Sequence, residues 1–217
     1  MSSERKPSLD VREACLAEAL KVIETDGVEA LSMREVARRL GISHQAPYKH
    51  FKSRDHILAE IVARAYDSFA AYLDSRTHAD PAGGLAVMGQ AYFEYAQRHS
   101  LQFRLMFNTT LPDPTLHPEM MAKAKRAFAL LRDAIAELPE TRAAEDPAAQ
   151  ADLDALFVWS TIHGLSTLMH SDATRTLELS DKVEARALSN TLLRIGTGID
   201  KGYHMKPGGT KRPDKLP

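Results

Sequence analysis

The amino-acid sequence predicts an all-α fold of about nine helices, and three observations support this prediction. Apolar residues recur at the spacing of an α-helix along almost the whole chain. No segment alternates apolar and polar residues between turn signals, which is the pattern of a half-buried β-strand. Residues typical of helix starts and breaks, such as Ser32, Gly41 and Pro118, separate the periodic stretches. We therefore expect helices packed on helices, without a sheet.

The first two expected helices lie near the N-terminus. Residues 9–26 place apolar side chains on one face and stop at Gly27, because glycine tolerates the left-handed backbone conformation that ends many helices. A shorter helix over residues 32–40 begins with Ser32 and has Glu35 three positions later. This spacing is that of a capping box, in which the two side chains satisfy free N–H groups at the helix start.

Two further helices are expected after a turn. Gly41 allows a tight turn, and Ser43 caps a second short helix over residues 43–50. Ser53 caps a long helix that continues to residue 76. The remaining helices are expected over residues 85–98, 101–107, 118–138, 148–171 and 181–202, with an acidic loop over residues 139–147.

Bulk composition limits the classes of protein to consider. The 217 residues are 44% hydrophobic, which suffices for a packed core. A formal net charge of −1 argues against a protein that coats nucleic acid without sequence preference. Residues 1–20 lack a sustained apolar run, so we expect no signal peptide and a cytoplasmic location. The single cysteine, Cys15, is expected to be a buried helix residue.

Two short helices joined by a glycine turn match the geometry of a helix-turn-helix, whose second helix enters the major groove of DNA. The same stretch is locally basic, because residues 32–54 contain six Lys and Arg and one Glu, a sum of +5. An alternative interpretation of the charge is an ordinary solvated helix face. The geometry favours DNA binding.

The candidate DNA contacts are the polar side chains around the second short helix. Gln45 is the best candidate for a base contact, because its amide can bond both N6 and N7 of adenine. Basic side chains fit contacts to phosphates. Tyr48 is alternatively a core aromatic with its hydroxyl at the surface, and His50 a packing or capping residue. The predicted DNA-binding residues are Ser32, Arg34, Ser43, His44, Gln45, Tyr48, Lys49, His50 and Lys52.

These residues also carry a family resemblance. Leu-Ser-Met-Arg-Glu-Val-Ala over 31–37, Leu-Gly-Ile-Ser over 40–43 and Tyr-Lys-His-Phe-Lys-Ser over 48–53 resemble the N-terminal signature of the TetR family of transcriptional regulators. Trp159, His163 and Gly164 resemble a Trp-…-His-Gly motif that identifies one subgroup by its C-terminal domain. Pro47 departs from the helix formers usual at its position, and in a first turn we expect it to remove at most one backbone hydrogen bond.

The resemblance implies an N-terminal three-helix DNA-binding domain followed by a helical domain that senses a ligand and forms a homodimer. We predict the first over residues 1–53, the second over 54–203, and a disordered tail over 204–217. A two-fold dimer presents two recognition helices about 34–36 Å apart to double-stranded operator DNA. Family members build the dimer interface from two helices of each subunit.

The C-terminal half contains a helix without charge. Residues 155–171 hold no Asp, Glu, Lys or Arg and are apolar on every side, so we expect one face in the core and another against a partner chain. We reject a membrane span, because the stretch is short and contains polar residues such as Ser160 and His163. The predicted interface residues are Leu153, Leu156, Leu168, Leu188, Leu192, Ile195 and Ile199.

A small-molecule effector is expected in a mostly apolar cavity. The candidate lining residues are Phe103, Met106, Phe107, Met121, Phe128, Trp159 and His163, and the alternative for each is an ordinary core position. His163 and His170 are seven residues apart, which does not match the adjacent-turn spacing of a metal site. We predict neither a metal nor a cofactor.

The sequence thus favours a transcriptional repressor that a small apolar or aromatic ligand releases from its operator. An enzyme is the first rival, but the sequence contains no G-x-S-x-G, P-loop, Rossmann or H-E-x-x-H motif. A helical interaction protein without DNA affinity is the second rival. Such a protein would tolerate replacement of Gln45, Lys49 and Lys52 by alanine.

Overall fold

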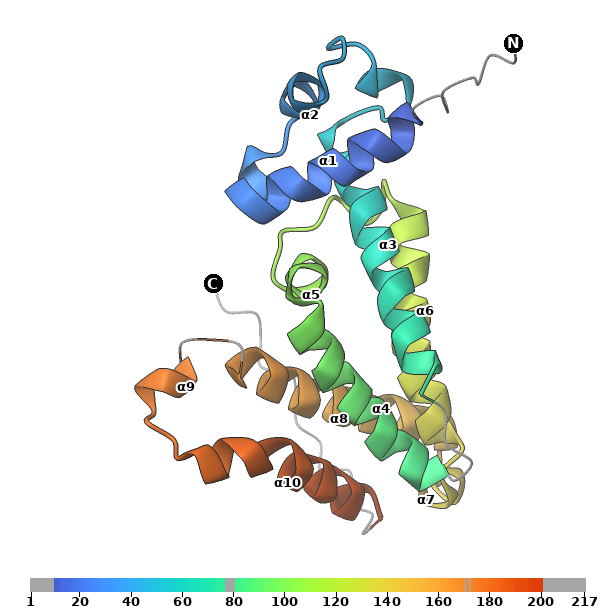
Figure 1. Cartoon of the computed structure of the whole chain (residues 1–217). Coiled ribbons are helices and arrows are strands. Elements are labelled where there is room, and N and C mark those ends of the chain that lie inside the picture. The colour runs from blue at the N-terminus through green and yellow to red at the C-terminus, as the bar shows by residue number, and fades with distance from the viewer. Residues whose placement is uncertain (1–9, 77–80, 170, 172, 201–217) are drawn as a thin grey trace, which may run out of the picture. The chain divides into compact units, whose positions relative to one another are not determined.

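The computed structural model of the chain describes residues 10–76, 81–169, 171 and 173–200 (Figure 1). These ranges contain helices and turns and no strand, which confirms the predicted all-α fold. The α-helices are α1 (Val11–Asp26), α2 (Met33–Leu40), α3 (Arg54–Asp74), α4 (Pro81–Arg98), α5 (Ser100–Phe107), α6 (Pro118–Ala136), α7 (Pro139–Arg142), α8 (Pro147–Met169), α9 (Ala173–Thr176) and α10 (Asp181–Asp200), and the short 3-10 helices are η1 (Val28–Ala30) and η2 (Pro47–Lys49).

The chain divides into two compact units. Unit 1 comprises residues 1–77 and 91–131, and unit 2 comprises residues 78–90 and 132–217. The second half of α4 and most of α6 belong to unit 1. The predicted boundary between residues 53 and 54 stays a prediction, and the predicted tail over residues 204–217 lies outside the described residues.

Unit 1 is built around α3. The aromatic ring of Phe69 on α3 lies 5.2 Å from the ring of Tyr92 and 5.0 Å from that of Tyr95, so α4 packs against α3. Tyr95 is fully buried and its hydroxyl donates to the carbonyl of Ala65. On another side α6 runs beside α3 (Figure 1), where the Lys123 ammonium lies 2.7 Å from the Asp67 carboxylate.

Unit 2 contains α8 and α10, which pack against each other. A Cβ atom added to Gly89 of α4 would lie 2.5 Å from a methyl of Leu192, so α4 approaches α10 closely. The stretch 139–147 was expected to be a loop, and this is wrong over α7, because Pro139 takes the first position of a short helix, where its missing N–H costs nothing. None of the helices described here has the length and apolar character needed to cross a membrane.

Candidate nucleic-acid interface

The first helix of the predicted motif, α2, has Ser32 as its N-cap residue, as expected. The Ser32 hydroxyl accepts a hydrogen bond from the Glu35 N–H at 3.1 Å. The Glu35 carboxylate does not complete a capping box; it bonds Arg38 at 2.6 Å and Arg39 at 2.7 Å instead. These two guanidinium groups hold the pKa of Glu35 at about 2, below its ordinary 4.5.

The turn after α2 depends on Gly41. Its backbone is left-handed, with φ of 65°. The Gly41 N–H donates to the carbonyl of Arg38 at 3.2 Å, and the Ile42 N–H donates to that of Ala37 at 3.1 Å. This pair of hydrogen bonds is the Schellman motif, which ends α2 and redirects the chain.

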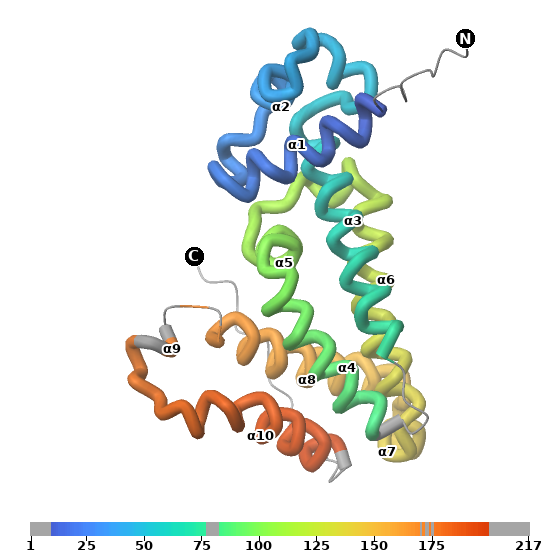
Figure 2. Tube along the Cα trace, viewed as in Figure 1, coloured from blue at the N-terminus to red at the C-terminus, as the bar shows by residue number. Residues whose placement is uncertain are grey.

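The second helix of the motif differs from the prediction. Residues 43–50 follow α2 in the blue part of the tube in Figure 2. They form a turn followed by the 3-10 helix η2, where a continuous α-helix was expected. Pro47 has no N–H to bond the carbonyl of Ser43, which instead accepts from the Ala46 N–H at 3.0 Å. The next hydrogen bond, from the Lys49 N–H to Ala46, has the same three-residue spacing. The segment is therefore wound more tightly than an α-helix.

All nine predicted DNA-binding side chains are exposed to solvent. Pro47 and Phe51 point inward and are buried, and Phe51 is 4% exposed. Tyr48 is 50% exposed, so it is not a core aromatic. The other predicted contacts are all exposed: Ser32, Arg34, Ser43, His44, Gln45, Lys49, His50 and Lys52.

Within the residues that the structure describes, three of the six basic residues over 32–54 already bind other groups of the protein, and three do not. Arg38 and Arg39 bind Glu35, and Arg39 also pairs with Asp26. Arg54 donates to backbone carbonyls. In the part of the chain that the structure describes, no ion pair engages the remaining three cations, Arg34, Lys49 and Lys52. These three are the charges that the surface can offer to phosphates.

The DNA-binding residues predicted from the sequence do not include two arginines, Arg12 and Arg54, that hold the 43–52 segment and its neighbours in place. Arg12 of α1 lies over the Phe51 ring, 5.5 Å from its centre, and pairs with Glu60 of α3 at 3.1 Å. Arg54 donates to the carbonyls of Leu31 at 3.0 Å and Val28 at 2.7 Å. Both arginines contact residues that are far away in the sequence. A local sequence pattern cannot predict such contacts.

The predicted ligand residues fall into two groups. Phe103, Met106, Phe107, Met121 and Phe128 belong to unit 1, and Trp159 and His163 belong to unit 2. In unit 1, the rings of Phe103 and Phe107 lie 5.0 Å apart, and both contact Tyr92. In unit 2, the ring of Trp159 lies 6.2 Å from that of His163, whose pKa is lowered by burial. Met121 and Phe128 are half-buried on α6.

The predicted dimer residues differ in exposure. Leu153, Leu156 and Leu168 are 62%, 51% and 53% exposed on α8. Leu188 and Leu192 are partly exposed. Ile195 and Ile199, by contrast, are buried within unit 2, because α10 packs against α8. Among the described residues no group of three or more His, Cys, Asp or Glu side chains could hold a metal, and His170 of the sequence-based metal test lies outside them.

Comparison with protein families finds two matches. Residues 16–61 match the family described as bacterial regulatory proteins, tetR family. Residues 85–190 match the tetracyclin repressor-like, C-terminal domain. The first match covers α2, Gly41 and the exposed 43–50 segment.

Individual proteins give the same result. The HTH-type transcriptional activator FasR of Mycolicibacterium smegmatis is 28% identical over 136 residues, which are 62% of this chain and 61% of that protein. The match therefore spans less than two thirds of that relative. Among solved structures, PfmR, a TetR family transcriptional regulator from Thermus thermophilus, is 26% identical with a TM-score of 0.59 over 83% of this chain and 97% of its own. The regulatory protein SCO4313 is 25% identical with a TM-score of 0.69 over 85% and 94%.

Proposed function

Since this chain belongs to the TetR family of transcriptional regulators, we propose that it is a repressor that leaves its operator when a small apolar or aromatic ligand binds. The observation that carries the DNA-binding part is the surface of residues 43–52, where Gln45, Lys49 and Lys52 are exposed together beside the buried Phe51. A bacterial operator lies in the cytoplasm, so the proposal includes that location.

The proposed roles follow from chemistry. Gln45 contacts a base edge, because a side-chain amide can donate to and accept from adenine at once. Arg34, Lys49 and Lys52 contact phosphates, with Tyr48 and the free N–H groups at the start of α2 in support. Among the described residues, these three cations carry no competing ion pair, so binding need not break one.

A gel-shift series on fragments selected from the source genome tests this proposal. Lys52→Ala should weaken binding to every fragment and lower the slope of log affinity against log salt by about 1. Gln45→Ala should relax preference at one base pair. Lys125→Ala, which removes an exposed cation on α6, is the matched control and should change neither quantity. Absence of binding by the wild type to any fragment would favour the interaction protein without DNA affinity. Wild-type affinity in all three variants would exclude the 43–52 surface as the DNA contact.

The ligand part of the proposal rests on the aromatic side chains Phe103 and Phe107 within unit 1 and, separately, on Trp159 within unit 2. The relative FasR is named an activator, so the direction of regulation is part of the test. Transcription from a selected operator should fall when the protein is added and recover with an effector that lowers operator affinity. If the added protein instead stimulates transcription, the protein is an activator and the repressor proposal is wrong. The narrower subgroup stays a proposal that rests on Trp159, His163 and Gly164.

We also propose a homodimer through the outer faces of α8 and α10. Leu153, Leu156 and Leu168 expose apolar surface on one broad side of α8. Gly164 lies on the same side by helical spacing, and a Cβ added there would meet nothing within 4 Å. A mid-helix glycine on an open apolar face costs helix stability, which a closely packed partner helix would offset.

A further inference from the structure

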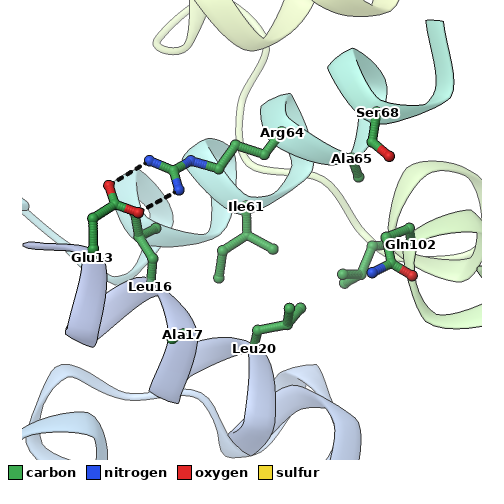
Figure 3. A pocket seen from close by; sticks show the side chains of 10 residues that line it. Glu13, Leu16, Ala17, Leu20, Ile61, Arg64, Ala65, Ser68 and Gln102 are labelled. Atoms are coloured by element: carbon green, nitrogen blue, oxygen red, sulfur yellow. Dashed lines mark hydrogen bonds and ion pairs between the residues drawn. The ribbon is translucent and has the colours of Figure 1, made fainter. Parts of the chain in front are cut away.

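Unit 1 contains a hollow that neither the DNA-binding surface nor the predicted ligand residues use. It lies between α1, α3 and α5 and has a volume of about 240 Å³ (Figure 3). Its lining residues include the apolar Leu16, Leu20 and Ile61 and the polar Glu13, Arg64 and Gln102. We propose that this hollow, which we call the α1 groove, binds a small neutral molecule with an apolar body and one hydrogen-bonding head group.

The base of the α1 groove is apolar. Leu105 is fully buried, and Leu16 and Ile61 are 4% and 7% exposed. Leu20 and Ala17 continue this surface along α1. Figure 3 shows Ile61 between Leu16 on one side and Gln102 on the other, with Leu20 below it. A concave apolar surface with few polar groups at its edge is the usual form of a small-molecule site.

The charges at the edge select against an ion. The Arg64 guanidinium donates two hydrogen bonds of 2.7 Å to the Glu13 carboxylate and a third of 3.0 Å to Glu60. Arg12 pairs with Glu60 as well. Two arginines and two glutamates thus cancel, and each is already engaged. A charged head group would lose its hydration without gaining a free counter-ion.

A neutral head group has a partner in Gln102. Its side-chain amide has no hydrogen bond to any other residue that the structure describes, and it lines the groove from α5. An amide offers one acceptor and two donors, which suits a primary amide, an alcohol or a ketone. The volume matches roughly eight water molecules at about 30 Å³ each, so the whole ligand, head group included, should have about eight heavy atoms.

Methyl NMR of the full-length protein tests this proposal with three probes of equal chain length: hexanamide, hexanoate and hexylammonium. Hexanamide should shift the Ile61 methyl signal, together with those of Leu16 and Leu105, in a saturable way with a Kd on the order of 1 mM. The two charged probes should bind at least about tenfold more weakly. Hexanoate or hexylammonium binding as tightly as hexanamide would overturn the assignment of a neutral ligand.

Three variants test the location of the ligand and its head-group partner. Ala17→Phe fills the groove from an exposed position on α1 and should abolish the hexanamide shifts. Ala122→Phe, an equal change at an exposed position on α6 of the same unit, should leave them intact. Gln102→Leu should weaken hexanamide at least fivefold, about the loss of one hydrogen bond. Shifts confined to unit 2, or full binding by Ala17→Phe, would overturn the proposal whatever the operator experiments show.

Discussion

At the scale of single residues, Gly41 supports the turn of the DNA-binding region by its backbone alone. Its φ is 65°, and an added Cβ would meet nothing within 4 Å. Gly41→Ala should therefore destabilise the protein by about 1–2 kcal/mol through backbone strain and not through a clash. Gly41→Asn should cost less, because asparagine tolerates this conformation better. Urea unfolding measures both, and an equal cost for the two variants would contradict this explanation.

The lowered pKa of Glu35 predicts how the stability of the fold depends on pH. Its pKa in the folded protein is about 2, lowered from 4.5 first by the hydrogen bond to Arg38 and then by that to Arg39. A lowered carboxyl pKa stabilises the fold fully above the unfolded value, and the stabilisation is lost as pH falls through the folded value. The free energy of unfolding of the wild type should therefore exceed that of Glu35→Gln by a gap that narrows between about pH 4.5 and pH 2.

Urea unfolding at several pH values and constant ionic strength measures this gap. Glu24→Gln is the matched control, since it removes an exposed carboxylate of α1 that has no ion pair in the described chain. A gap for Glu35→Gln that stays constant down to pH 2 would show that the Arg38 and Arg39 bonds do not stabilise the fold. Added salt should narrow the gap at neutral pH as well.

At the scale of elements, Arg54 ties η1 to the start of α3. Its guanidinium donates to the carbonyls of Val28 and Leu31. Arg54→Met should cost about 1.5–3 kcal/mol, because both partly buried carbonyls lose a charged donor. Arg38→Met should cost less, because the Arg38 side chain is 66% exposed and that of Arg54 only 37%. Equal losses in urea unfolding would mean that the carbonyls find other donors.

The close approach of α4 and α10 gives a second prediction at this scale. Gly89→Ala brings a Cβ within 2.5 Å of a Leu192 methyl, and should cost about 1–3 kcal/mol. The leucine tip can rotate, so the lower end of this range is expected. In a Leu192→Ala background the same change should cost nothing or stabilise α4, because alanine favours helices over glycine. Additive losses in this double-mutant cycle would contradict the contact.

Local signals explain which elements the sequence predicts correctly. Ser32 and Gly41 define α2 because capping and left-handed turns depend on a few neighbouring residues. The 43–50 segment departs from the predicted α-helix because Pro47 removes a donor at the point where the ladder should start. The sequence does not predict the contact between the Arg12 guanidinium and the Phe51 ring, because only the fold brings these two residues together.

At the scale of the whole molecule, the exposed apolar side of α8 connects the DNA-binding proposal with the homodimer proposal, because an operator with two half-sites requires two copies of the DNA-binding surface. Leu156 and Leu168 expose apolar surface there, and covering it in a dimer is favourable. The polar 43–52 surface and this side of α8 lie in different units, so each can be changed without altering the other unit's core.

Gly164→Leu separates folding from assembly. Nothing lies within 4 Å of an added Cβ at Gly164, so the single chain should tolerate leucine and gain up to about 1 kcal/mol of helix stability. A closely packed partner helix would clash with the new side chain, and the dimer Kd in sedimentation velocity should rise at least about tenfold. Ala122→Leu on α6 should leave assembly unchanged. Binding of Gly164→Leu to a fragment with two half-sites should weaken while binding to one half-site persists, whereas an unaltered dimer would exclude this face of α8 from the interface.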